Sequence, residues 1–533
     1  MNTPNTNPNN LQKLVDIGIS LSKEKNIDIL LEKILTEARE ISNSDGGTLY
    51  TMIDNDTRLK FSIMQNDSMN VFEGGSNGTM STDKYYPVKL YHDDTNEPNL
   101  NNMSAICAIQ GRTILVEDTY SEDKYDLSGP KGFDKKHNYY SKCFLNVPLK
   151  NHKDKVIGVL QLLNPMDKGE LITYNKELVK LVESLTSQAS IALTNQLLID
   201  EQKQLFKSFI QLVSEALEKK DATTGGHCNR VPNITMMIAD AINNDKADKF
   251  KNFNFKEDEM EELFVAGWLH DFGKVATPEH VMNKSTKLEG LYDKIDHIKI
   301  RFEVLKRDVK IKYYNLMKDD KNNKELSNTM NHELTNINED LKFLEKCNIG
   351  GEFMSDVLKQ RVKEISKYKI DSNNELKNIL SEEEINFLTL ERGTLDENER
   401  KIMEDHVSLT FELLDKLPYP SHLKNVPFFA GCHHEKINGE GYPNGYKGEQ
   451  LPLQARVIAL ADVFEGLTAP DRPYKNGYKL SKAMAILKDM AFCNEIDKDI
   501  FNLFIKKKVY LRYAKDNINS SQIDDINDQD LLI

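Results

Sequence analysis

Six histidine and aspartate side chains in the second half of the sequence have the chemistry needed to hold metal ions. They are His270, Asp271, His406, His433, His434 and Asp462. Imidazole nitrogens and carboxylate oxygens suit divalent first-row transition metals, and one carboxylate can bridge two ions. Because adjacent residues of a helix point about 100° apart, neighbouring imidazoles serve ions on either side of a bridging group more easily than they serve one ion. These residue types predict a metal centre.

The surroundings of Asp462 and the position of Lys274 support this prediction. Asp462 lies in the apolar segment 459–464, where an unpaired carboxylate would cost several kcal/mol, so it needs a cation. Lys274 follows His270 by four residues and Asp271 by three. In a helix this spacing places the ammonium group on the same face as both. We therefore expect Lys274 to hold a phosphate oxygen beside the metals.

Length and charge restrict the class of protein. The chain has 533 residues, enough for two to four domains of roughly 100 to 200 residues each. Its 70 Lys and Arg against 84 Asp and Glu give a net charge of −14, so no general basic surface exists for nucleic-acid polymers. An anionic substrate must instead meet a few local cations or metal ions.

The sequence contains no membrane or export signal that we can identify. No run approaches the roughly 18 consecutive apolar residues of a membrane helix, and residues 1–10 lack the charged start and apolar middle of a secretory signal. The six cysteines form no C-x-x-C pair, which predicts reduced thiols rather than disulfides. We expect a cytoplasmic protein with a flexible segment at 1–24.

The first third of the chain predicts a small α/β domain. Apolar residues at helical spacing, Leu31, Ile34, Leu35, Ala38 and Ile41, predict a helix that packs on a sheet. The runs 144–149 and 156–163 flank a polar turn and predict a hairpin. Segments 45–50 and 157–164 resemble those of a GAF domain, a sensory module, over about 25–198. The resemblance implies a fold and leaves any ligand open; Cys107, Cys143 and His137 could attach a chromophore or haem, but core or surface roles are commoner.

A long helix is expected at 176–220. Its apolar positions alternate steps of four and three in Leu178, Val182, Leu185, Ala189, Ala192, Gln196 and Ile199, which is the pattern of a heptad seam. One interpretation is a parallel homodimer whose helix carries signals from the sensor. The alternative is an amphipathic helix that packs within one chain.

Charged helical patterns fill residues 288–390, and we interpret them as an insertion. It contains the segment 350–353, Gly-Gly-Glu-Phe, which is similar to the diguanylate cyclase signature. We reject that interpretation because the cyclase motif lies on a hairpin within a longer α/β domain. The polar tail at 516–533 is expected to be disordered.

Taken in order, the histidine and aspartate motifs resemble the HD-GYP family of metal-dependent phosphohydrolases. The motifs are 270–274, HD-x-GK, and 433–443, HHE followed by a Gly-Tyr-Pro loop; the similarity covers about 205–290 and 391–495. It implies an all-α helical bundle at 205–515 and, with the sensor domain, an α+β chain. It also implies hydrolysis of cyclic di-GMP to pGpG, GMP or both.

The same resemblance assigns roles to individual residues. Two iron or manganese ions would be bound by His227, His270, Asp271, His406, His433, His434 and Asp462, with Asp271 bridging. Lys274, Arg472 and Lys475 match positions that contact substrate phosphates, and Tyr442 could stack on a base. Asp271 and Lys274 would be the catalytic pair.

Two departures from the family pattern qualify these roles. Thr223 stands where some members carry a glutamate that helps to hold a third metal, so we expect two ions and leave His227 as a weak ligand or a support for one. Asn438 replaces the more usual aspartate of the Gly-Tyr-Pro loop; it preserves turn formation and loses a charge. The alternative functions are a catalytically silent signalling protein that binds cyclic di-GMP or a partner, and a phosphohydrolase acting on another cyclic dinucleotide or nucleotide.

Overall fold

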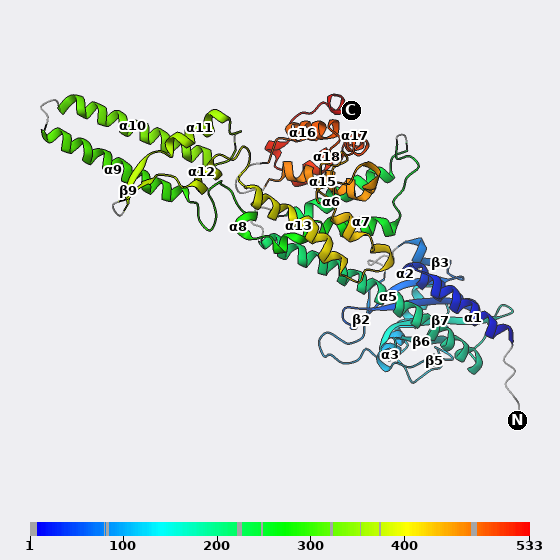
Figure 1. Cartoon of the computed structure of the whole chain (residues 1–533). Coiled ribbons are helices and arrows are strands. Elements are labelled where there is room, and N and C mark those ends of the chain that lie inside the picture. Colours follow the sequence, from blue (N-terminus) through cyan, green and yellow to red (C-terminus); the bar gives the residue numbers. More distant parts are fainter. Residues whose placement is uncertain are drawn as a thin grey trace. The chain divides into compact units, whose positions relative to one another are not determined.

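The computed structural model describes residues 8–78, 80, 85–220, 226–246, 249–319, 323–351, 353–372, 375–470 and 477–533. The chain forms two compact units, 1–206 and 207–533 (Figure 1). The first contains a sheet with flanking helices, and the second is mainly helical. The α+β class predicted from the sequence is therefore confirmed. Among the described residues, no helix combines the length and the apolar character needed to cross a bilayer.

The first unit is built on one antiparallel sheet with the strand order β3-β2-β1-β7-β6-β5, with β4 paired to β2 and β8 to β7. The strands are β1 (Ser44–Ile53), β2 (Arg58–Asn66), β3 (Val71–Gly74), β4 (Val88–Lys89), β5 (Ile114–Val116), β6 (Phe144–Lys150), β7 (Val156–Asp167) and β8 (Glu170–Leu171). The predicted hairpin is β6–β7, in which Asn146 faces Gln161.

Helices cover both faces of this sheet. They are α1 (Pro8–Lys23), α2 (Ile27–Ser42), α3 (Met103–Gln110), α4 (Ser128–His137) and α5 (Lys176–Lys220). Helix α2 begins because the Asn26 side chain accepts the backbone N–H groups of Asp28 and Ile29. Its apolar face joins α1, α5 and one face of the sheet in a single core, while α3 packs in a second core. Leu14, Ile17 and Leu21 of α1 are buried in the first core, so the prediction of a flexible segment at 1–24 is wrong for residues 8–23, because apolar side chains at helical spacing pack there.

The predicted heptad seam of α5 lies mostly inside this first core. Val182, Leu185, Ala189 and Ala192 are all buried there. They cannot form an interface with a second chain while they occupy the core of their own domain. The intrachain alternative therefore describes this part of α5.

The second unit is a helical bundle that continues from the end of α5. It comprises α6 (His227–Asn243), α7 (Glu257–Leu269), η2 (Phe272–Ala276), α8 (Glu279–Met282), α13 (Glu397–Asp415), η3 (Ser421–Leu423), α14 (Val426–Ala430), η4 (Gly448–Gln450), α15 (Leu453–Thr468), α16 (Leu480–Phe492), α17 (Lys498–Lys506), α18 (Val509–Asn517), η5 (Ser520–Gln522) and α19 (Asp528–Leu531). Helix α13 begins with a capping box, in which Asp396 and Glu399 each accept the other's backbone N–H.

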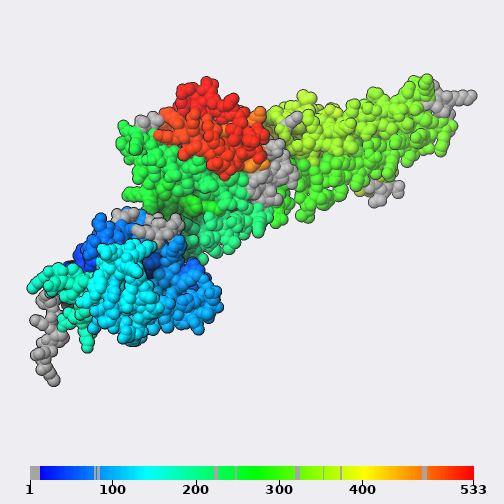
Figure 2. Space-filling view, turned by 180° about the vertical axis from the view of Figure 1, so that it is seen from behind, coloured from blue at the N-terminus to red at the C-terminus, as the bar shows by residue number. Residues whose placement is uncertain are grey.

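The segment between α8 and α13 has a core of its own. It consists of α9 (Ile295–Asp319), α10 (Asn323–Asn348), α11 (Asp356–Ile365), β9 (Lys369–Ser372), β10 (Glu375–Asn378) and α12 (Glu382–Leu388). Helices α9 and α10 lie side by side (Figure 1 and Figure 2). The short β9–β10 hairpin was not predicted from the sequence. Of the cyclase-like segment, Glu352 lies outside the described residues.

The end of the chain differs from its predicted disorder. Asp524 accepts hydrogen bonds from the backbone and the hydroxyl of Ser481, at 2.9 and 2.7 Å. Leu531, in α19, is buried. The segment is polar in composition, but these contacts attach it to α16, which composition alone does not reveal.

Candidate metal centre

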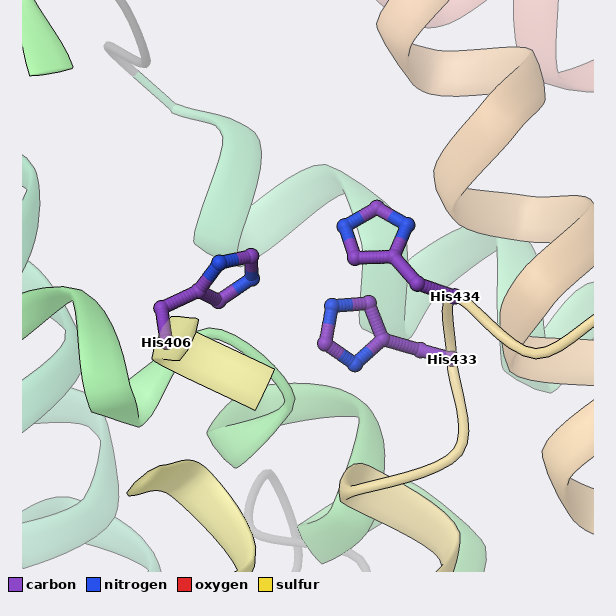
Figure 3. A group of neighbouring side chains, drawn as sticks. All are labelled: His406, His433 and His434. Carbon is purple, nitrogen blue, oxygen red and sulfur yellow. The ribbon is translucent and has the colours of Figure 1, made fainter. Parts of the chain in front are cut away.

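The described ligand candidates come from five separate parts of the second unit. His227 is the first residue of α6, His270 and Asp271 lie between α7 and η2, and His406 is in α13. His433 and His434 follow α14, and Asp462 is in the middle of α15. Figure 3 shows the imidazoles of His406, His433 and His434 gathered around one space. The fold therefore brings all seven predicted ligands together.

The carboxylate of Asp271 lies between two groups of histidines. Its Oδ2 is 3.4 Å from Nε2 of both His227 and His270. Its Oδ1 is 3.3 Å from Nε2 of His406 and 3.7 Å from Nε2 of His433. A carboxylate in this position has one oxygen available to each of two cations.

The possible metal ligands form two groups, one near each oxygen of Asp271. One comprises His227, His270 and Asp271, and the other comprises His406, His433 and His434; in each, the ligand atoms lie within 4.8 Å of one another. Oδ1 of Asp462 is 3.3 Å from Nε2 of His227 and 3.7 Å from Nε2 of His270, so it joins the first group. The donors thus form two adjacent clusters.

Hydrogen bonds to the backbone orient three of the imidazoles toward the centre. Nδ1 of His270, His406 and His433 donates to the carbonyls of Gly267, Met403 and Ala430, at 2.8, 2.5 and 2.6 Å. Each ring therefore turns its Nε2 lone pair inward, as metal-bound histidines do.

The inward nitrogens lack ordinary partners. Nε2 of His406 and Nε2 of His433 are buried and have no hydrogen-bond partner among the described residues. Nε2 of His227 lies 3.2 Å from Nε2 of His270. When both rings are neutral and carry their protons on Nδ1, two lone pairs face each other, and a cation between them, either a proton or a metal ion, removes this repulsion. A metal cation resolves both problems, so the residues present fit a divalent metal centre.

The surroundings of His433, His434 and Asp271 lower the pKa values of all three groups. Burial, with a smaller contribution from neighbouring histidines, lowers the pKa of His433, and burial lowers the pKa of His434 to about 4. Burial acts to raise the pKa of Asp271, but Lys274 and His270 outweigh it and hold that pKa well below its usual range. At neutral pH, these imidazoles are neutral and this carboxylate is ionised, which are the forms that bind metal.

His227 has a supporting carboxylate that sequence reasoning missed. Its Nδ1 donates to Oε2 of Glu465 at 2.5 Å, and Oε1 of Glu465 accepts from Nε of Arg230 at 2.7 Å. Burial acts to lower the pKa of His227, but Asp271, Asp462 and Glu465 raise it well above its usual value. The site thus favours a positive charge at His227, which a metal ion could supply in place of a proton. The position of Glu465, three residues after Asp462 on α15, was the available signal.

The structure describes two of the four residues predicted to contact the substrate. Nζ of Lys274 donates to Oδ2 of Asp271 at 2.6 Å, and the ring of Tyr442 lies 4.9 Å from that of His434. Arg472, Lys475 and Thr223 lie outside the described residues. Asn438 accepts the backbone N–H of Glu440 at 2.9 Å, a turn that an aspartate could also form.

Tyr442 also lines a cavity of about 860 Å³ between its loop, α13 and the end of the inserted segment. Arg392, Arg400 and Lys401 are on its wall, together with the carboxylates of Glu404 and Asp405. Its mixed charge offers cations for phosphates and acceptors for N–H groups of a base. Residues 386–390, at the end of the inserted segment, contribute Asn386, Thr389 and Leu390 to the lining.

Comparisons with known proteins agree with this architecture. A GAF domain model matches residues 24–194, and two HD domain models match residues 224–370 and 383–500. The chain therefore carries a GAF domain followed by an HD domain. The resemblance to HD-GYP proteins is confirmed for the HD region, whereas the finer limits at 25–198 and 205–515 stay predictions.

Several curated relatives match this chain over the HD region. A 3'3'-cGAMP-specific phosphodiesterase 3 of Vibrio cholerae is 40% identical over 97 residues, 18% of this chain and 20% of the relative. The cyclic di-GMP phosphodiesterase response regulator RpfG of Xanthomonas campestris is 39% identical over 98 residues, 18% of this chain and 25% of the relative. A cyclic di-GMP phosphodiesterase of Thermotoga maritima is 32% identical over 104 residues, 20% of this chain and 28% of the relative. The matches thus span less than a third of each relative.

Proposed function

We propose that the second unit is a metal-dependent phosphodiesterase that hydrolyses cyclic di-GMP to pGpG, GMP or both. The observation that carries this proposal is the Asp271 carboxylate, which presents one oxygen to each of two histidine groups. In one of these groups, Nε2 of His406 and Nε2 of His433 are buried and have no hydrogen-bond partner among the described residues. The names of the matched relatives support a cyclic dinucleotide as the substrate class.

The residues divide the work as follows. His227, His270 and Asp462 would hold one ion, and His406, His433 and His434 the other, with Asp271 shared between them. Two divalent ions, iron or manganese, would supply Lewis acidity and lower the pKa of a water toward neutrality.

Lys274 and Tyr442 would act directly on the substrate. The ammonium group of Lys274, held against Asp271, would donate to a non-bridging phosphate oxygen as negative charge grows on it. The Tyr442 ring would pack against a base at the edge of the 860 Å³ cavity. We retain Arg472 and Lys475 as predicted phosphate contacts.

The test is turnover by the purified full chain loaded anaerobically with Mn²⁺ or Fe²⁺. Cyclic di-GMP, 3'3'-cGAMP, cyclic di-AMP and a linear dinucleotide would be offered, and products would be separated by chromatography. We expect cleavage of cyclic di-GMP by the natural chain and none by folded, Asp271→Asn protein. Tight binding without cleavage would support the silent signalling alternative.

The same panel decides between two substrates. Several matched relatives are named as 3'3'-cGAMP-specific enzymes, so this dinucleotide is the second candidate. A kcat/KM at least tenfold higher for 3'3'-cGAMP than for cyclic di-GMP would replace the proposed substrate and retain the proposed chemistry.

We also propose that the GAF unit regulates this activity, with an unidentified ligand or none.

We further propose that the chain forms a homodimer through α5. Helix α5 carries apolar side chains at every seventh position that are 48 to 72% exposed. They are Ile191, Leu198, Leu205 and Leu212. This spacing suits pairing with the same helix of a second copy. Light scattering should give a dimer for the natural chain and a monomer for Leu205→Lys; a monomeric natural chain would refute the interface. The cytoplasmic location stays a prediction.

A further inference from the structure

The last turns of α5 are hydrogen-bonded to both segments that supply the first group of metal ligands. Ser214, which is fully buried, donates through its hydroxyl to the Trp268 carbonyl at 3.0 Å. Glu218 accepts the backbone N–H of Cys228 at 2.7 Å. Lys220 donates through Nζ to backbone carbonyls within residues 274–277, shortly after His270 and Asp271.

The contacts of Lys220 fall on the turn that carries Lys274. Its ammonium group is 3.0 Å from the carbonyl oxygen of Thr277 and 3.5 Å from that of Lys274, and it also donates to the carbonyl of Val275. Three carbonyls converging on one ammonium group fix the course of this turn. A displacement of Lys220 would therefore move the backbone at Lys274, three residues after Asp271.

The contact of Glu218 falls beside the other ligand. Cys228 follows His227 directly, and its N–H is among the amide groups at the start of a helix that have no partner within it. Gly226, at the cap position, has no side chain to satisfy these groups. Glu218 supplies the missing acceptor and places a negative charge at the positive end of α6.

We propose that Ser214, Glu218 and Lys220 are positioning residues for the metal centre. Together they set the start of α6, and with it His227, relative to the segment that carries His270 and Asp271. This inference rests on the proposed metal-dependent function. It also supplies a route by which a movement of α5 would change metal affinity and the position of Lys274.

The test compares substitutions at the contacting residues with substitutions at exposed neighbours on the same helix. Lys220→Met and Glu218→Leu remove the donor and the acceptor, and Lys219→Met and Glu215→Leu are the matched controls, because both of these neighbours are exposed. Mn²⁺ affinity of the full chain would be measured by calorimetry and by electron paramagnetic resonance. Loss of an outer supporting contact weakens metal binding by roughly 10- to 100-fold, so we expect at least tenfold for the first pair and less than twofold for the controls.

Conservative variants separate positioning from general destabilisation. Lys220→Arg retains a donor and Glu218→Gln retains an acceptor, so both should restore Mn²⁺ affinity to within about threefold of the natural chain. If Lys220→Met fails to fold, Glu218→Leu and its rescue by glutamine decide the question. Folded variants with unchanged Mn²⁺ affinity would overturn the proposal.

The metal titrations also keep this proposal distinct from the proposed activity. A natural chain that binds Mn²⁺ but cleaves no cyclic dinucleotide would refute the phosphodiesterase, while the variant affinities would still test the positioning role. Conversely, full activity together with unaltered metal affinity in both variants would retain the enzyme and reject the role of α5.

Discussion

Replacement of Glu465 by glutamine tests whether this buried carboxylate fixes the protonation of His227. The glutamate is 1% exposed and accepts from both Nδ1 of His227 and Nε of Arg230. With Nδ1 as the donor, Nε2 of His227 keeps its lone pair for a metal. Glutamine preserves the size of the side chain but has one acceptor and one donor end.

Neither orientation of the glutamine satisfies both neighbours. If its NH₂ group faces His227, the imidazole must accept at Nδ1 and carry its proton on Nε2, which removes a metal ligand. If the NH₂ group faces Arg230, two donors oppose each other in a buried site. We expect Glu465→Gln to weaken metal binding by roughly 10- to 100-fold, which is about 1.4 to 2.8 kcal/mol.

Calorimetric titration of metal-free full chain with Mn²⁺ would measure this change, with circular dichroism as the test of folding. Glu449→Gln, at an exposed position of the same unit, is the matched control for the loss of one charge. Natural affinity in folded Glu465→Gln protein would refute the argument that His227 is a ligand held by Glu465.

Three other perturbations have definite expected results. Gly273→Ala should destabilise the second unit by more than about 3 kcal/mol, because the added Cβ would lie 1.9 Å from the His406 carbonyl oxygen. Gly132→Ala is the control, since a Cβ there meets nothing within 4 Å. Similar urea midpoints for the two variants would contradict this packing. Burial acts to raise the pKa of Glu384, but Arg301 lowers it below 4.5, so their pairing should stabilise the fold above about pH 4.5 and lose that contribution as pH falls through the lower folded-state pKa. The stability difference between the natural chain and Glu384→Gln should then shrink between pH 7 and pH 3.5 in urea denaturation, and a constant difference would reject the linkage. Finally, removal of bound metal with a chelator should lower the Tm measured by calorimetry, since metal that binds only the folded chain stabilises it; an unchanged Tm would argue against a resident metal.

The residues of the candidate metal centre could be selected from the sequence because they carry their chemistry in their types. His270, Asp271 and Asp462 are informative wherever the fold places them, since buried charge and imidazole nitrogen require partners. Glu465 lacked such a signal on its own, because glutamate is common on helix surfaces. Only its spacing from Asp462 and the need of His227 for an acceptor pointed to it.

Periodicity could predict the linking helix but not what covers it. Val182 and Leu185 repeat as in a coiled coil, yet the same repeat suits a helix that packs on a sheet. Which surface a helix buries depends on residues far away in the sequence. For the same reason, the contacts of Lys220 with the turn after Asp271 and the burial of Leu531 could not be inferred from local patterns.

Anomalous X-ray diffraction at the manganese edge, from crystals of the full chain grown with Mn²⁺, tests the central claim most directly. We predict two peaks flanking the Asp271 carboxylate, one among His227, His270 and Asp462 and the other among His406, His433 and His434. No peak at this position, or manganese bound only elsewhere, would contradict the two-ion centre.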